Sequence, residues 1–250
     1  MNFSDFIAHS NSLSAYSPSG DLVGVAKGFE LRVFETNSLR PMHQFTFIDF
    51  VTQIDWSPDS NFILVSIAKR AMVFVKSLND QDWNCKIDQG LAGLTFARWA
   101  PDSRFVLTVS EFNLRLSVWS LADKSSQFIR NPKHADRGVA FSKNGKTMAL
   151  IQKTEDQKDI VVLYDLSQKK WTTIAQFHPE LYDIEDVKFS KDGAHLICTD
   201  SPLKAQIAIF KIQEGQVTPV TKFTPYDHAL GFRNVQFSPN EQYVLGACCD

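Results

Sequence analysis

Short apolar runs alternate with polar turns along the whole chain, and the runs are rich in Val, Ile, Leu and Phe. Runs of this kind, bounded by turn residues, are typical of strands, whereas a helix repeats its apolar positions every three or four residues. No run approaches the about 18 apolar residues that a membrane-spanning helix needs. The pattern therefore predicts an all-β protein.

One turn motif recurs six times between these runs. An aromatic residue is followed by a small residue, a Pro or Lys and then polar or Gly residues, and the turns lie near 17–20, 57–60, 100–103, 142–145, 190–193 and 238–241. The small residues of successive copies are 40, 43, 42, 48 and 48 positions apart. Pro presets φ at the first central position of a turn, and Asp, Asn, Ser and Gly suit the positions after it. Each copy therefore predicts a tight turn between two strands.

Further strands follow each turn. Six positions beyond the small residue stand the apolar residues Val23, Ile63, Val106, Met148, Leu196 and Val244. Third strands are predicted at 31–34, 72–75, 116–119, 161–164 and 207–210, and a fourth, outer strand leads to the next copy, as at 83–87.

Four strands repeated about every 40–45 residues are the signature of a propeller blade. The repeat therefore resembles the WD repeat, and it predicts a single propeller domain over 1–250 with five complete four-stranded blades and a partial sixth. We expect a truncated seven-bladed propeller, because closure of the ring removes exposed sheet edges. A chain that is completed by a partner or by self-association is the alternative.

Composition narrows the function classes. The net charge is -2, which gives no basic excess for nucleic acid, and the first residues lack the basic and apolar regions of a secretory signal. Four cysteines without C-x-x-C spacing indicate a reduced, cytoplasmic protein. We expect no nucleic-acid partner and no membrane insertion.

Catalytic and metal-binding motifs are absent from the sequence. No His/Cys cluster has zinc-ligand spacing, and Gly-x-Ser-x-Gly, Gly-x-x-x-x-Gly-Lys and Gly-x-Gly-x-x-Gly do not occur. We therefore expect no catalytic residue, metal, cofactor or small-molecule substrate. The Gly-His dipeptide that feeds the buried hydrogen-bond relay of many WD blades is also missing, so the blades are expected to depend more on apolar packing. The segment 131–134 is interpreted as a connection.

Some stretches are more specific than the repeat. The start at 1–4, the stretches 83–90 and 92–94, the stretch 111–121 and, more weakly, 226–231 are similar to the centrosomal and spindle-pole WD-repeat proteins typified by WD repeat-containing protein 8. The resemblance implies a non-enzymatic scaffold at the centrosome, spindle pole or basal body. It implies a coiled-coil centrosomal partner, a minus-end-directed kinesin in some assemblies, anchoring of microtubule minus ends and support of the spindle or cilium.

Two other function classes stay open. One is a generic WD-repeat adaptor in trafficking, translation or RNA processing, which would lack the stretches between Trp83 and Leu121. The other is the propeller domain of a larger hydrolase, which would need a catalytic domain. Fold alone does not decide between them.

The same stretches suggest a binding site. In a WD blade the loop that enters the innermost strand and the loop between the second and third strands lie on one face, so one patch is predicted to contain Asp88, Gln89, Glu111, Phe112 and Asn113. Phe112 would be an aromatic anchor in it, unless its ring folds back onto the blade. A second candidate consists of Tyr226, Asp227 and His228. Trp83, Arg115 and Trp119 are interpreted as core or inter-blade contacts.

Overall fold

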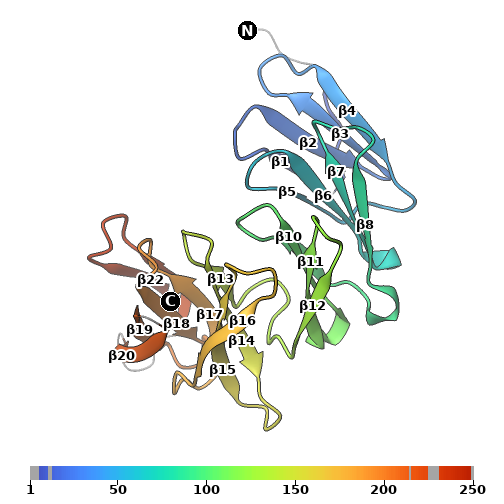
Figure 1. Ribbon diagram of the computed structural model, residues 1–250. Coiled ribbons are helices and arrows are strands. Elements are labelled where there is room, and N and C mark those ends of the chain that lie inside the picture. The colour runs from blue at the N-terminus through green and yellow to red at the C-terminus, as the bar shows by residue number, and fades with distance from the viewer. Residues whose placement is uncertain (1–5, 11–12, 214, 225–230, 249–250) are drawn as a thin grey trace. The chain divides into compact units, whose positions relative to one another are not determined.

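The strands pair in chain order, so that the chain completes one sheet before it begins the next (Figure 1). The computed structural model describes residues 6–10, 13–213, 215–224 and 231–248. Five sheets have four strands each, and the last described sheet has two. This confirms the predicted architecture of five complete blades and a partial sixth. The chain divides into two compact units, Met1–Phe128 and Ile129–Asp250, and a single domain over the whole chain stays a prediction.

The first unit contains three sheets, which are ordered β1-β2-β3-β4, β5-β6-β7-β8 and β9-β10-β11-β12. The strands are β1 (Ser14–Tyr16), β2 (Leu22–Lys27), β3 (Glu30–Glu35), β4 (Pro41–Thr46), β5 (Gln53–Trp56), β6 (Phe62–Ile67), β7 (Met72–Ser77), β8 (Asn84–Asp88), β9 (Phe96–Trp99), β10 (Phe105–Val109), β11 (Arg115–Ser120) and β12 (Ser126–Arg130), whose end crosses the unit boundary. Three short 3₁₀ turns interrupt the loops, namely η1 (Ala68–Arg70), η2 (Gly90–Ala92) and η3 (Glu111–Asn113).

The second unit contains two four-stranded sheets, β13-β14-β15-β16 and β17-β18-β19-β20, and the two-stranded sheet β21-β22. The strands are β13 (Val139–Phe141), β14 (Thr147–Lys153), β15 (Asp159–Asp165), β16 (Thr172–Phe177), β17 (Ile184–Phe189), β18 (His195–Asp200), β19 (Ile207–Gln213), β20 (Gln216–Phe223), β21 (Phe232–Phe237) and β22 (Val244–Cys248). The predicted third strands are all confirmed, within a few residues at their ends.

The core of each unit lies between neighbouring sheets. Successive side chains of a strand point to opposite faces, and β6 is buried on both of them. Ile63, Val65 and Ile67 pack with residues of the first sheet such as Leu31, whereas Leu64 packs with residues of the third sheet. A fully buried Leu or Ile stabilises the fold by about 1.5–3 kcal/mol. In the second unit the same arrangement joins β13–β16 to β17–β20 and β17–β20 to β21–β22.

The small residue of the turn motif is a serine in five of the six copies, and its hydroxyl bonds within the turn. In the second copy Phe62 N donates to Ser57 Oγ (2.9 Å), and that hydroxyl donates to Asp59 Oδ1 (2.5 Å). The residue at the fourth turn position is left-handed in all six copies, with φ between 58° and 79°, and these residues are Gly20, Ser60, Ser103, Gly145, Gly193 and Glu241. Only Gly adopts this region without strain. The hydroxyl is present in five of the six copies, and the third copy forms the same turn with Ala100 in its place, so the turn favours the hydroxyl but requires only a tolerant fourth residue.

Successive turns within a unit are also bonded to each other. Ser19 N donates to Ser60 Oγ (3.0 Å), and Asp59 N donates to Ser103 Oγ (3.1 Å). In the second unit Asp192 N donates to Glu241 Oε1 (2.9 Å). The side chain at the left-handed position thus holds its turn against the preceding one.

Candidate protein-interaction surface

Two loops lie side by side where the second sheet leads to the third. One is the β8–β9 connection, which contains η2, and the other is the β10–β11 connection, which contains η3. Gly93, at φ +68°, lies directly against Glu111: a Cβ built on this glycine would be 2.5 Å from the Glu111 Cγ and Cδ atoms. A larger residue at this position would have to displace the Glu111 side chain, so Gly93 allows the two loops to touch.

Most residues of the predicted patch face solvent or the loop itself. Asp88 is exposed; its Oδ1 accepts a hydrogen bond from Gly90 N (2.9 Å), and Lys86 Nζ lies 3.9 Å from its Oδ2. Glu111 is exposed, and Asn113 is half-buried, with its backbone N–H donating to Ser110 O (3.3 Å). These residues are brought together by the contact of the two loops.

Phe112 is the most prominent of these side chains. It is 89% exposed and does not fold back onto the blade. Its backbone is left-handed (φ 57°, ψ 17°), which costs a non-glycine residue about 1–2 kcal/mol. An exposed aromatic ring held by a strained backbone is a feature that clusters at functional sites.

Two leucines that sequence reasoning did not name join Phe112. Leu91 in η2 is fully exposed, and Leu114 directly after η3 is also exposed. Single exposed apolar residues are common, but here they stand in the two touching loops. The sequence signal for Leu91 is an apolar residue between two glycines, Gly90 and Gly93, in a loop. We call the set Asp88, Leu91, Glu111, Phe112 and Leu114 the blade-three patch.

Gln89, by contrast, turns into the blade. It is 4% exposed, and its Nε2 donates a hydrogen bond to Thr108 Oγ1. The same hydroxyl accepts a hydrogen bond from Trp119 Nε1 (2.9 Å). The third sheet therefore has a buried side-chain hydrogen-bond relay to which Gln89 and Trp119 both donate, and the predicted place of Gln89 in the exposed patch is wrong. That the blades depend more on apolar packing stays a prediction. Trp119 is a blade-core residue, as expected.

A buried ionic cluster lies in the second unit, in the segment interpreted as a plain connection. Lys133 Nζ donates to Asp159 Oδ2 (2.5 Å), to a carboxylate oxygen of Asp183 and to Ile184 O (2.7 Å). Side chains of Lys133 and Asp159 are 6% and 8% exposed. Burial alone would raise the pKa of the Asp159 carboxyl, but hydrogen bonds from Lys133 and Ile184 N and the charges of Lys133 and Lys153 hold that pKa below its ordinary value. The cluster joins β13–β16 to β17–β20.

The second candidate site, Tyr226, Asp227 and His228, lies outside the described residues.

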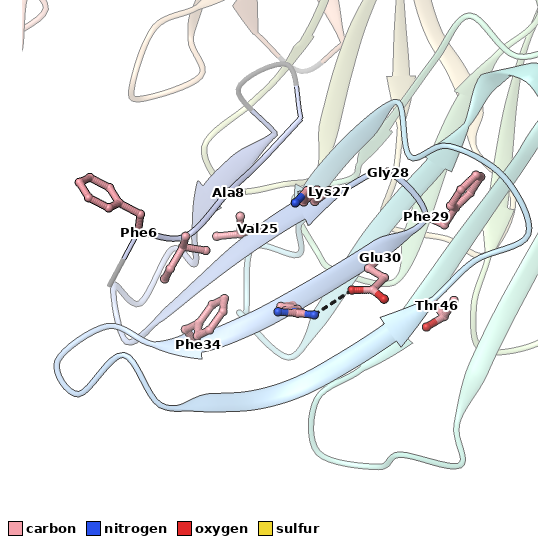
Figure 2. Close-up of a pocket in the computed structure, with 11 residues that line it drawn as sticks. Phe6, Ala8, Val25, Lys27, Gly28, Phe29, Glu30, Phe34 and Thr46 are labelled. Atoms are coloured by element: carbon pink, nitrogen blue, oxygen red, sulfur yellow. Dashed lines mark hydrogen bonds and ion pairs between the residues drawn. The ribbon is translucent and has the colours of Figure 1, made fainter. Parts of the chain in front are cut away.

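A hollow of about 680 Å³ opens on the first sheet (Figure 2). Val25, Lys27 and Arg32 line it, and these alternate along the strands with core residues such as Ala26, so the hollow is on the sheet face opposite that core. Arg32 is paired with Glu30 at 3.1 Å. No Ser, Cys or His lines it. Its described lining thus offers apolar surface and one ion pair, without a nucleophile paired to a base.

The described part of the chain offers neither a metal cluster nor a membrane-spanning helix. No group of three or more His, Cys, Asp or Glu residues there is placed to hold a metal ion. None of the helices in that part has the length and apolar character required to cross a bilayer.

Comparison with known proteins also points to a propeller. No protein-family model matches the chain. A mouse protein, WD repeat-containing protein WRAP73, is 32% identical over 244 residues, which are 98% of this chain and 52% of the mouse protein. This protein is a WD-repeat β-propeller. Because it covers 52% of the mouse protein, this WD-repeat chain spans about half the length of the relative that it matches.

Solved propellers share the fold of the WD-repeat protein. The β-propeller domain of Cps50 (Swd1) from Myceliophteria thermophila has a TM-score of 0.61 at 13% identity and covers 98% of this chain and 82% of its own. A chain in the crystal structure of the mitotic checkpoint complex also has a TM-score of 0.61, at 11% identity, with 94% and 73% covered. At such identities the likeness supports the fold alone.

Proposed function

We propose that this WD-repeat protein is a non-catalytic scaffold that captures a polypeptide partner with the blade-three patch. The observation that carries the proposal is Phe112, a ring that is almost fully exposed on a strained backbone beside Leu91 and Leu114. Binding energy at protein interfaces concentrates in a few aromatic and aliphatic anchors, with polar residues around them. Asp88 and Glu111 supply such a polar rim.

We propose further that the scaffold works at the centrosome or spindle pole. There it would act with a coiled-coil centrosomal protein, and in some assemblies with a minus-end-directed kinesin, to anchor microtubule minus ends and to support the spindle or cilium. The support is the similarity of 83–94 and 111–121 to centrosomal and spindle-pole WD-repeat proteins. The blade-three patch is built from these same stretches.

Affinity capture of the tagged full-length protein from dividing cells, read by mass spectrometry, tests the proposal. We expect recovery of a coiled-coil centrosomal protein with the wild type. The double variant Phe112→Ala/Glu111→Lys should lose it. A matched control is Leu203→Ala, because Leu203 is an exposed leucine in the corresponding β18–β19 loop. Undiminished capture by a well-folded double variant contradicts the patch, and recovery of ribosomal or coat proteins instead contradicts the location.

A further inference from the structure

We infer that the blade-three patch is one end of a longer, bipolar docking surface, which crosses the loop ends of the first three sheets and takes one polypeptide segment. The segment would have an apolar side, an acidic end over the first two sheets and a basic end over the third. This inference rests on the proposed function, because it extends the same patch.

The loops concerned share one edge of the first unit. The turn motifs of its three sheets are bonded to one another through Ser60 and Ser103, at one end of the strands. The β2–β3 turn, the β4–β5 connection, η1, η2 and η3 come at the other end of the same strands. Since β1 contacts β5 and β5 contacts β9, these loops follow one another along that edge.

An aromatic cluster marks the end at the first two sheets. Phe29 in the β2–β3 turn and Phe50 in the β4–β5 connection have ring centroids 4.4 Å apart, and 58% of Phe50 is exposed. Ile48, beside them in the chain, is also exposed. Backbone bonds from Phe47 N to Phe29 O (2.8 Å) and from Val51 N to Gly28 O (2.9 Å) hold the connection against the turn. The cluster is thus preorganised, which lowers the entropic cost of binding.

Basic side chains stand next to this cluster. Arg70 Nε bonds Asp49 Oδ2 (2.9 Å), and Lys69 Nζ lies 4.0 Å from the same oxygen. The side chain of Asp49 is 8% exposed, whereas those of Lys69 and Arg70 are 77% and 56% exposed. Two cations share one buried carboxylate, so this end presents a net positive charge to solvent.

The other end carries the opposite sign. Glu111 is exposed beside Phe112 on the third sheet, and Asp88 is exposed at the end of β8, where the second sheet leads to the third. Lys86 is the only cation that an ion pair joins to them among the described residues. A nucleic acid would be attracted to one end of the surface and repelled from the other. A polypeptide with separated charges satisfies both ends, and complementary charge of this kind fixes orientation and register.

The span suits a short segment. Stacked sheets lie about 10 Å apart, so the loop ends of the first and third sheets are about 20 Å apart. A helix rises about 1.5 Å per residue and would cross this distance in about 13 residues.

Photo-crosslinking from exposed aromatic positions tests the inference. A benzoyl-phenylalanine replaces Phe50 or Phe112 in the full-length protein in dividing cells, and the crosslinked partner peptides are sequenced. Leu203 is the matched control position. We expect positions 50 and 112 to crosslink to one segment of one protein, with acidic residues near the first crosslink and basic residues near the second.

The outcomes separate this inference from the proposed function. Crosslinks from position 112 alone, crosslinks to two different proteins, or the reverse charge order overturn the bipolar surface and leave the patch standing. An absence of crosslinks from both positions overturns both proposals.

A charge variant gives an independent readout. Lys69→Glu should weaken capture of the same partner about three- to five-fold at low salt, and high salt should remove most of the difference. Lys191→Glu, at an exposed lysine in a turn at the opposite end of the strands, is the control. Equal capture by Lys69→Glu and the control at low salt contradicts the assigned polarity.

Discussion

Replacing Phe112 by asparagine should separate the stability of the protein from its binding. The ring is 89% exposed, so folding buries about a tenth of its roughly 200 Å². At about 25 cal/mol per Å², the loss of this contact costs about 0.5 kcal/mol. The left-handed backbone at φ 57° costs phenylalanine about 1–2 kcal/mol, whereas asparagine tolerates it. The strain relief outweighs the lost contact, so the free energy of unfolding should rise by about 0.5–1.5 kcal/mol.

Binding should change in the opposite direction. If Phe112 is an anchor of the interface, its removal costs about 2 kcal/mol, which is a roughly thirty-fold loss of affinity. Urea titration of the purified full-length chain measures the first effect, and titration of the captured partner measures the second. Leu203→Asn is the control, because Leu203 is exposed but its φ is not positive. The free energy of unfolding of this control variant should not rise.

Either of two results would refute this reasoning. A loss of more than about 1 kcal/mol of stability would mean that the ring is packed against the blade. An unchanged affinity in a stable variant would mean that the exposed ring does not bind the partner.

Four further predictions concern stability and can be checked by denaturation of single variants. Lys133→Ala should lower the free energy of unfolding by about 3 kcal/mol, since it removes the buried cation that pairs with the buried Asp159 carboxylate; a loss below about 1 kcal/mol contradicts a stabilising role of this ion pair. The pKa of Asp159 is lowered in the fold, so its contribution is full above the ordinary carboxyl pKa and is lost as pH falls through the folded value; Asp159→Asn should therefore be destabilised at pH 7 and differ less from wild type in acid. Burial raises the pKa of Asp55, against weaker opposite effects of hydrogen bonds and Arg98, so its charge opposes folding at neutral pH; Asp55→Asn should gain stability at pH 7, and the gain should vanish below about pH 4, near the unfolded pKa. Ser60→Ala should cost about 1 kcal/mol, because Ser19 N loses its acceptor while the left-handed strain remains; an unchanged midpoint would show that water replaces the bond.

The sheets could be predicted from the sequence because their signals are local. Turn residues and apolar periodicity fix where a strand begins and ends, and the period of the repeat then gives the blades. The contact between the β8–β9 and β10–β11 loops could also be predicted, since the topology of a blade places these loops together. The exposure of Phe112 follows from the loop and could be anticipated.

The remaining details depend on long-range contacts. Lys133 lies 26 residues from Asp159 and 50 from Asp183, so nothing in the local sequence marked it as buried. The sequence alone places Gln89 in an exposed patch, and only the position of Thr108 shows that its amide is buried and hydrogen-bonded. The segment 47–51, Phe-Ile-Asp-Phe-Val, resembles a strand in its composition, yet it forms the connection that exposes Ile48 and Phe50.

The left-handed turn position also bears on how the repeats have diverged. A copy with glycine at this position, as at Gly193, can follow any neighbour, because it offers no side chain to bond. A copy with Ser60 or Glu241 is matched to the turn before it. Duplication or recombination of a matched copy would place its acceptor beside an unrelated turn, so selection should preserve the order of such repeats. Glycine copies are the positions at which the array can lengthen or shorten with the smallest penalty.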